Sequence, residues 1–446
     1  MIVMNKNLIA YLAILSLLTS CSYMPAWMGG RTEEKPKLEG QRLVALPVES
    51  KLQIDIALKS MPPKLPAVTA NSDWLQHSGV FTANTGNLAG GDWAIKNSAK
   101  IGNGNSFSHS LVARPVVLGG IVFAMDSAGV ISAHDAVDIS KIIWKSTIIA
   151  DDKEHDVIGG GVAVDGGVLY ATTGQGTVGA FEVATGKNLW RKDFGVPMRA
   201  SPRISAGKII VVTMDSKTYA LSSKTGEIAW EHSGINETAG VMNSVSPTVA
   251  GNTLLVPYAS GELFALSMEN GNPQWNDTLL LNNRTKSSGV FMGIGGDPVV
   301  DGNVVFAVNN NGVTVAINAK GERVWQQQAA SINTPWLAGD ELFMLTADNL
   351  VIDMVKTTGK IRWITPLDSF ADMEQKLRPI SWRGPVLVAG NLVLISSHGE
   401  MVFVSTTTGK ITAIKEIPNN ITTAPVVAGG RLYLVGQNAI LYSFSQ

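Results

Sequence analysis

The chain contains a single cysteine in 446 residues, and charged residues make up only 16% of it. One thiol cannot form an internal disulfide, so a disulfide-stabilised scaffold is excluded. The formal net charge is −1, which leaves no basic field to attract nucleic acid. The six histidines show no metal-ligand spacing, and no G-x-S-x-G motif occurs. We therefore predict no catalytic residue, no bound metal, no cofactor and no nucleic-acid partner.

Glycine, by contrast, is abundant at 45 residues, and several glycines stand four positions before a tryptophan. A sixth copy of this pattern starts at Gly409 but ends in Ala413, and an earlier copy has Ser140 before Trp144. Such a repeat at a fixed period is typical of a propeller or a solenoid. The five full copies are Gly186/Trp190, Gly226/Trp230, Gly271/Trp275, Gly321/Trp325 and Gly359/Trp363.

Each repeat unit reads as four short strands separated by glycine-containing turns. Most units open with a proline followed by apolar residues, and the last short strand of the unit carries the tryptophan. The units recur about every 44 residues, the length typical of a four-stranded propeller blade. We therefore predict an all-β, eight-bladed propeller of antiparallel blades. Its units start at Pro115, Gly161, Pro202, Pro247, Pro298, Pro335, Pro385 and Pro425.

The two ends of the chain are predicted to close this ring. The sequence stops soon after the third strand of unit eight, and the orphan stretch Trp93–Lys96 can supply the fourth. Closure of this kind leaves no open sheet edge. The repeated tryptophans are predicted to pack between blades, beside small residues such as Ala180, Ala220 and Ala265, rather than to bind a ligand. The predicted set is Trp93, Trp144, Trp190, Trp230, Trp275, Trp325 and Trp363.

The N-terminus reads as an export signal. Lys6 precedes an apolar stretch, Leu8–Leu18, that is too short to span a membrane but suits a signal peptide. It ends in Leu18-Thr19-Ser20-Cys21, which resembles a bacterial lipobox, and this implies cleavage after residue 20 and acylation of Cys21. Ser22, where an aspartate would resemble an inner-membrane retention signal, favours a lipid anchor in the outer membrane, on its periplasmic face.

The domain prediction follows from these segments: a signal peptide at 1–20, a tether at 21–70 and the propeller at 71–446. Six prolines interrupt the tether, which favours a flexible spacer between lipid and propeller. The alternative is a short docked segment where Leu52, Ile54, Ile56 and Leu58 alternate with other residues.

The stretch Ala180–Trp190, with Thr185-Gly186-Lys187 before the tryptophan, resembles the pyrroloquinoline-quinone (PQQ) enzyme repeat. That repeat is shared by quinoprotein dehydrogenases and by propellers without activity. The lipobox, the short tether and eight repeats together resemble the BamB family of outer-membrane assembly lipoproteins. The stretches Glu39–Glu49 and Asp73–Gly79 resemble its alphaproteobacterial members.

This resemblance implies a non-catalytic scaffold of the Bam complex. Its implied partners are the POTRA domains of BamA, other Bam lipoproteins and unfolded outer-membrane proteins. The family's partner-binding leucines and arginine fall on Ala239, Val241 and Met242, so the arginine is absent here. The positions of two acidic residues that the family carries in the next blade are occupied by glycines in this chain. Two cationic residues in the 276–292 insertion are the alternative source of charge for partner binding. These four further candidates are Gly293, Gly295, Arg284 and Lys286.

Two other functions stay open at this stage. A PQQ-dependent dehydrogenase would resemble its family in a calcium-held cofactor, a catalytic aspartate and often a vicinal cysteine pair, and this chain has no second cysteine. An envelope carbohydrate-binding propeller would need exposed aromatic residues, for which Trp336 and Trp382 are candidates. The acidic stretch 151–156 around His155 is a candidate metal site, with a solvated loop as the favoured interpretation.

Overall fold

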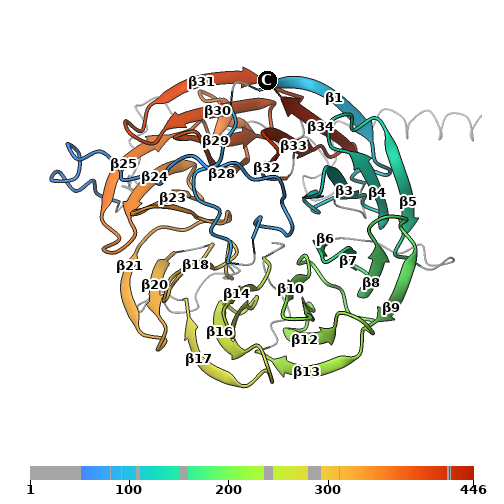
Figure 1. Cartoon of the computed structure of the whole chain (residues 1–446). Coiled ribbons are helices and arrows are strands. Elements are labelled where there is room, and N and C mark those ends of the chain that lie inside the picture. The colour runs from blue at the N-terminus through green and yellow to red at the C-terminus, as the bar shows by residue number, and fades with distance from the viewer. Residues whose placement is uncertain are drawn as a thin grey trace, which may run out of the picture. The chain divides into compact units, whose positions relative to one another are not determined.

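The computed structural model describes residues 52–80, 82–91, 93–106, 111–149, 159–235, 245–279, 293–310, 312–418, 421 and 423–445. Over these ranges every regular element is a β-strand, and no helix there could cross a membrane. Eight four-stranded antiparallel sheets follow one another around a ring (Figure 1). The predicted eight-bladed all-β propeller is confirmed.

Blades 1 to 4 each run from a short inner strand to an outer strand at the rim. Their strands are β2 (Val116–Leu118), β3 (Ile121–Met125), β4 (Val130–Asp135) and β5 (Ile142–Thr147); β6 (Gly160–Asp165), β7 (Val168–Thr173), β8 (Thr177–Glu182) and β9 (Asn188–Asp193); β10 (Arg203–Ser205), β11 (Lys208–Val212), β12 (Lys217–Ser222) and β13 (Ile228–Ser233); β14 (Thr248–Ala250), β15 (Thr253–Pro257), β16 (Glu262–Ser267) and β17 (Pro273–Thr278).

Blades 5 to 7 repeat this order, and blade 8 takes its outer strand, β1, from the start of the propeller. A two-stranded hairpin, β26 (Phe370–Asp372) and β27 (Leu377–Pro379), lies between blades 6 and 7. The blade strands are β18 (Val299–Asp301), β19 (Val304–Val308), β20 (Thr314–Asn318) and β21 (Arg323–Gln327); β22 (Trp336–Ala338), β23 (Glu341–Leu345), β24 (Leu350–Val355) and β25 (Ile361–Pro366); β28 (Trp382–Val388), β29 (Asn391–Ser396), β30 (Glu400–Ser405) and β31 (Ile411–Glu416); β32 (Val426–Ala428), β33 (Arg431–Val435), β34 (Ile440–Ser445) and β1 (Ala94–Lys100).

The apolar core lies between neighbouring blades, which is why both faces of the inner three strands are apolar. Phe123 and Trp144 of blade 1, for example, share a buried cluster with Val162 and Leu169 of blade 2. The outer strands are mostly exposed, and the residues at every second position are only partly buried over much of their length, as in β13 and β17. Burial on both faces in the inner strands and on one face at the rim is the pattern expected of stacked sheets.

The Gly–Trp repeat acts across the boundary between two blades. In blade 2, Ala180 lies opposite Trp190, so the small residue makes room for the ring. The Trp190 indole N–H donates to the carbonyl of Ser223 in blade 3, at 3.1 Å. A Cβ at Gly226 of blade 3 would lie 2.7 Å from the Trp190 ring. Each glycine of the repeat therefore receives the tryptophan of the preceding blade, as Gly226 does here.

Replacing Gly226 by alanine tests this contact. Gly226 has a φ of +72°, so alanine adds backbone strain to the collision with Trp190. We expect the free energy of unfolding to fall by about 2–3 kcal/mol, measured by denaturant titration. Gly207→Ala is the matched control, because Gly207 has a φ of +71° but open space around its Cβ position. Equal losses in the two variants would contradict an inter-blade role for the glycine.

The predicted ring closure is confirmed, because β1 pairs antiparallel with β34. The equivalence predicted for Trp93 is wrong by four residues. Asn97, not Trp93, lies opposite Ser443, the position that corresponds to Ala220 opposite Trp230. Trp93 falls at the place of the repeat glycine, and blade 7 has Ala413 in place of its tryptophan. At this boundary the large and small residues are exchanged, and Trp93 is buried with its indole N–H bonded to the Gly430 carbonyl.

Residues 71–91, which we call the plug, cross the middle of the ring (Figure 1). Their backbone bonds reach inner strands of several blades: Trp74 pairs with Val117 in blade 1, and Leu88 receives a bond from Ala389 and gives one to Leu387 in blade 7. The Val300 N–H of blade 5 donates to the carbonyl of Thr82. The plug therefore crosses the centre of the ring and is bonded to inner strands of blades 1, 5 and 7.

Residues 52–64, which we call the strap, are bonded to blade 6. Arg362 of β25 donates to the backbone carbonyls of Leu58 and Met61, and its guanidinium also pairs with Glu341 at 2.7 Å and with Asp353 at 3.1 Å. Ile54 forms a bridge with Ile361. The described part of the expected tether, 52–70, thus makes the contacts of a docked segment rather than of a free spacer.

Candidate functional site

The connections between blades emerge at one end of the ring, which we call the loop face. Outer strands end here and inner strands begin here, and the second and third strands of each blade turn here. The connection from β13 to β14 includes Ala239, Val241 and Met242, and that from β17 to β18 includes Arg284 and Lys286. These five candidates lie outside the described residues. Their flanking strands place both connections on neighbouring blades of the same face.

Gly293 and Gly295 are described, and both are buried just before β18. The Gly293 N–H donates to the Asn310 side chain and the Gly295 N–H to the Val308 carbonyl, each at 2.8 Å. A Cβ at Gly295 would lie 1.7 Å from the Ser331 carbonyl oxygen. The packing therefore leaves no room for an acidic side chain at Gly295, and we do not propose a direct partner contact for these glycines.

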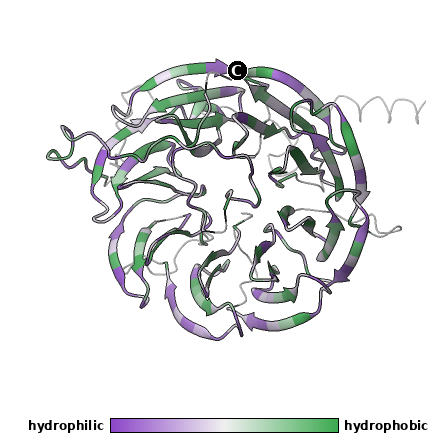
Figure 2. Cartoon of the chain, in the orientation of Figure 1, coloured by the Kyte–Doolittle hydropathy of each residue, from purple (hydrophilic) through white to green (hydrophobic). Residues whose placement is uncertain are grey.

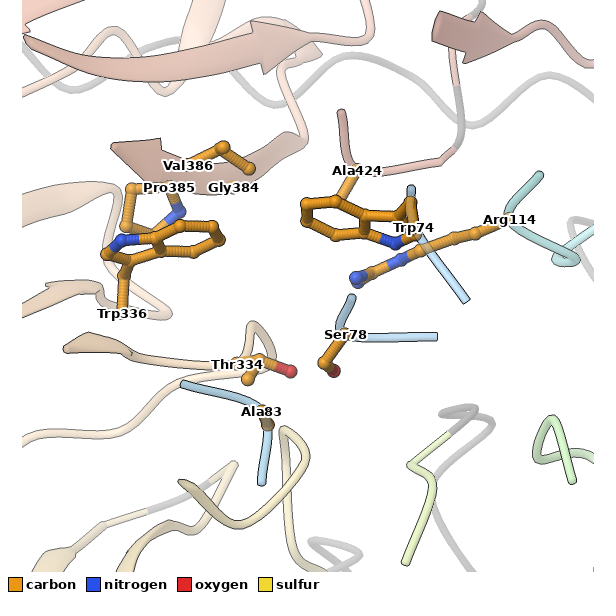
Figure 3. Close-up of a pocket in the computed structure, with 10 residues that line it drawn as sticks. All are labelled: Trp74, Ser78, Ala83, Arg114, Thr334, Trp336, Gly384, Pro385, Val386 and Ala424. Atoms are coloured by element: carbon orange, nitrogen blue, oxygen red, sulfur yellow. The ribbon is translucent and has the colours of Figure 1, made fainter. Parts of the chain in front are cut away.

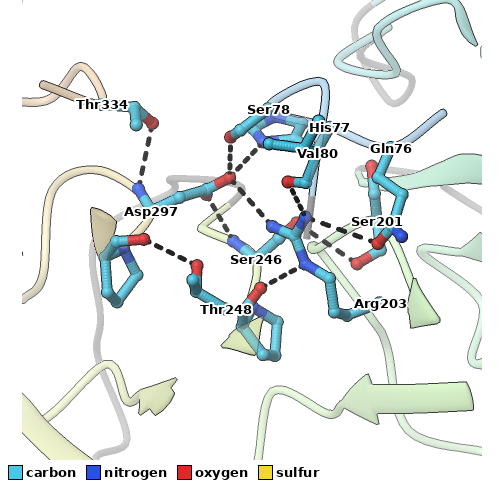
Figure 4. A network of polar contacts seen from close by, with 12 residues as sticks. Gln76, His77, Ser78, Val80, Ser201, Arg203, Ser246, Thr248, Asp297 and Thr334 are labelled. Carbon is cyan, nitrogen blue, oxygen red and sulfur yellow. Dashed lines mark hydrogen bonds and ion pairs between the residues drawn. The ribbon is translucent and has the colours of Figure 1, made fainter. Parts of the chain in front are cut away.

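Asp297, at the start of blade 5, is the centre of a polar network that joins the plug to three blades (Figure 4). Its carboxylate accepts hydrogen bonds from the His77 Nδ1 and the Ser246 N–H, each at 2.8 Å, and from the Ser78 hydroxyl. Arg203 pairs with it at 3.5 Å. Burial alone would raise the pKa of Asp297, but His77, Arg203 and Ser78 more than offset this and hold the pKa well below its ordinary value.

His77 and Arg203 complete this network from opposite sides. Burial and the nearby Arg114 lower the pKa of His77, so its imidazole is neutral at neutral pH and donates its Nδ1 hydrogen to Asp297. Arg203 is fully buried, and it also donates to the carbonyls of Pro247 and Val80 and to the side chain of Gln76. Blades 3, 4 and 5 are thus bonded to the plug through one guanidinium and one carboxylate.

A small pocket lies beside this network, between the plug and the first residues of the inner strands (Figure 3). Trp74 of the plug stacks on Trp336 of blade 6 with ring centroids 6.4 Å apart. Arg114 donates to the His77 carbonyl at 3.2 Å, and burial lowers its pKa to about 10, so it stays protonated at neutral pH. Asp297 beside the pocket is occupied by four donors, which makes it a structural anion rather than a base.

The two tryptophans considered for sugar stacking are buried, so they do not provide the exposed aromatic surface that this alternative would need. The Trp336 indole N–H donates to the Gly86 carbonyl at 2.7 Å, and that of Trp382 donates to the Asp368 carbonyl at 2.8 Å. Among the described residues, no group of three or more histidine, cysteine or acidic side chains could hold a metal ion. His155 and Cys21 lie outside the described residues.

Reasoning from sequence missed the plug and its network. His77 lies in the stretch Asp73–Gly79 that the resemblance singled out, but nothing in its spacing connects it with Asp297, 220 residues later. The signal that could have indicated the network is indirect: charged residues, namely Arg114, Arg203 and Asp297, stand at the starts of inner strands beside the repeat prolines.

The ring of eight blades, with Gly–Trp contacts at six of its boundaries, defines a β-propeller of the PQQ-repeat class. Residues 127–365 match the family described as outer membrane protein assembly factor BamB, and the chain belongs to this family. An uncharacterised protein of Rickettsia conorii is 27% identical over 295 residues, covering 64% of this chain and 70% of that protein. This relative fits the predicted alphaproteobacterial type. BamB of Escherichia coli is 25% identical over 381 residues, covering 79% and 88%.

Solved structures give the same fold. BamB of Moraxella catarrhalis superposes with a TM-score of 0.66 at 19% identity, covering 79% of this chain and all of that one. The quinohemoprotein alcohol dehydrogenase of Comamonas testosteroni reaches the same TM-score at 14% identity, covering 84% and 80%. The shared fold therefore does not distinguish a scaffold from a dehydrogenase.

Proposed function

We propose that this chain is a non-catalytic scaffold of the Bam complex that binds the POTRA domains of BamA through its loop face. Acylated Cys21 anchors it to the periplasmic face of the outer membrane, where it acts with other Bam lipoproteins to assist insertion of outer-membrane proteins. Family membership supports the assembly role. The observation that carries the absence of catalysis is Asp297, whose carboxylate is engaged by His77 and Ser78 of the plug and by Arg203 and Ser246 of the blades.

The loop face is the better candidate for the partner surface than the opposite end. At the opposite end, the plug and strap bond to turns of blades 1, 6, 7 and 8, whereas on the loop face the plug bonds to residues at the starts of the innermost strands, such as Asp297. On the loop face, the two longest strand-to-strand connections of mid-propeller, after β13 and after β17, lie on adjacent blades. Connections between strands commonly carry binding residues, which favours this face as the partner surface.

Affinity purification from membranes, followed by mass spectrometry, tests the proposal. We expect recovery of BamA and its lipoprotein partners with the lipidated chain. A folded chain that recovers none of them would overturn the proposal. The dehydrogenase alternative is tested separately by adding PQQ and calcium: a raised melting temperature together with dye-linked oxidation of an alcohol would favour it instead.

Charge reversal in the insertion tests which residues carry the interaction. The partner-binding arginine of the family is absent from this chain, and Arg284 and Lys286 are the candidates to replace its charge. If they do, Arg284→Glu with Lys286→Glu should lower BamA binding at least about tenfold. Binding is measured by co-purification and by titration with isolated POTRA domains. The matched control is Lys224→Glu with Lys320→Glu, two exposed lysines in turns at the opposite end. Unchanged binding in the first variant would eliminate these two residues.

A further inference from the structure

The outer strands are not alike around the rim. The four consecutive strands β31, β1, β5 and β9, which we call the cationic arc, carry six lysine or arginine residues and only two acidic ones. The other four outer strands, β13, β17, β21 and β25, carry two of each sign. Since all eight strands occupy equivalent places in the fold, the repeat itself does not require this difference.

The same arc concentrates exposed aliphatic side chains. Six are at least 42% exposed on its strands, against two on the other four outer strands. Figure 2 shows hydrophobic and hydrophilic stretches side by side along this part of the rim. Apolar and cationic residues are thus direct neighbours, as Ile95 and Lys96 are. The six are Ile95, Ile142, Ile143, Leu189, Ile411 and Ile414.

The lysine and arginine residues of the arc also differ from those of the other outer strands in the ion pairs that they form. Among the ion pairs between described residues, none includes Lys96, Lys100, Lys145, Arg191 or Lys192 of the arc. On the opposite side of the ring, Arg323 pairs with Asp277 at 2.7 Å and Arg362 with two buried acids. The side chains of Lys96 and Lys145 are exposed. A surface on which exposed aliphatic residues lie among these five cations is complementary to an anionic lipid interface.

We propose that the cationic arc, blades 7, 8, 1 and 2, rests on an anionic phospholipid surface, so that the ring stands on its edge. The inference rests on the lipid anchor of the proposed function, which brings the rim to the membrane. Thirty residues separate Cys21 from Leu52, and such a length can extend to about 100 Å, enough to reach any part of the rim. In this position the loop face points along the membrane and stays open to a partner.

Lysine labelling of the full acylated protein tests the proposal. The protein is inserted in vesicles of phosphatidylethanolamine with phosphatidylglycerol, or of phosphatidylcholine alone, and treated with an amine-reactive reagent. Each cation near an anionic surface contributes about fivefold to partition, so labelling of Lys96 and Lys145 should be at least about fivefold slower on the anionic vesicles. Labelling of Lys224 and Lys320, away from the arc, should be equal on both. High salt should abolish the difference.

Charge-reversal variants distinguish the contribution of the cationic arc from that of the lipid anchor. Lys96→Glu with Lys145→Glu should remove the protection of Lys100 and Lys141, whereas Lys224→Glu with Lys320→Glu should retain it. If the protein floats with both vesicles but its lysines are labelled equally on both, the proposed contact between the arc and the lipid is wrong, while the lipid anchor is still supported. Failure to float with either vesicle would instead contradict the anchor. Protection that depends on protein concentration and not on lipid charge would indicate contact between copies and would also overturn the inference.

Discussion

Asp297→Ala is expected to lower the free energy of unfolding by about 3–5 kcal/mol, because it removes the anion from a fully buried ion pair. Arg203 would be left buried without its carboxylate, and the Ser246 N–H and Ser78 hydroxyl would lose their acceptor. The plug should then open locally before the blades do. Denaturant titration measures the first effect, and hydrogen exchange of residues 71–91 measures the second.

Asp301→Ala is the matched control, since Asp301 ends the same strand that Asp297 precedes. Its ion pair with Lys356 is partly exposed, so its loss should cost about 1 kcal/mol or less. The sign of the pH effect follows from the lowered pKa of Asp297. Its stabilisation is present above the unfolded pKa of 3.8 and is lost on acidification, so the wild type and Asp297→Ala should converge in acid. Equal effects of the two substitutions would contradict a central role for Asp297.

The second large effect is expected at Asp353, with the opposite dependence on pH. Burial and the neighbouring Glu341 raise the pKa of Asp353 to about 8, against 3.8 when unfolded. The folded state therefore retains a proton that the unfolded state loses, and stability falls as pH rises between these values. Asp353→Asn carries the neutral form permanently. We compare the free energy of unfolding of Asp353→Asn with that of the wild type. We expect the difference in favour of the variant to be roughly 3 kcal/mol larger at about pH 8 than at about pH 5.

Thermal or denaturant unfolding at a series of pH values measures this difference. Above the folded pKa the two curves should run parallel again, which distinguishes the titration of one carboxyl from a general effect of alkali. Two unbonded oxygens, Glu341 Oε2 and Asp353 Oδ1, support a proton held between these groups. A constant stability difference across the pH range would show that Asp353 is ionised in the folded protein.

The repeat explains why so much of the fold could be predicted. Each blade is built from contacts close in sequence, such as Ala220 beside Trp230, and the same spacing reports all of them. Trp93 shows where this fails: at this boundary the large residue stands at the glycine place and Ala413 stands at the tryptophan place, so the spacing of a single tryptophan does not show which of the two places it occupies. The plug could not be predicted because its partners, such as Asp297 for His77, are set by the closed ring and not by spacing.

The order of contacts along the N-terminal segment also determines which contacts would resist a force applied at the N-terminus first. A pull from a membrane anchor would reach the strap first, where Arg362 holds the carbonyls of Leu58 and Met61. It would next reach the plug, where His77 and Ser78 are hydrogen-bonded to the buried Asp297, and only then β1, which closes the ring against β34. If the chain is anchored at Cys21 as proposed, the strap and the plug would take up such a force before it reached the pairing of β1 with β34.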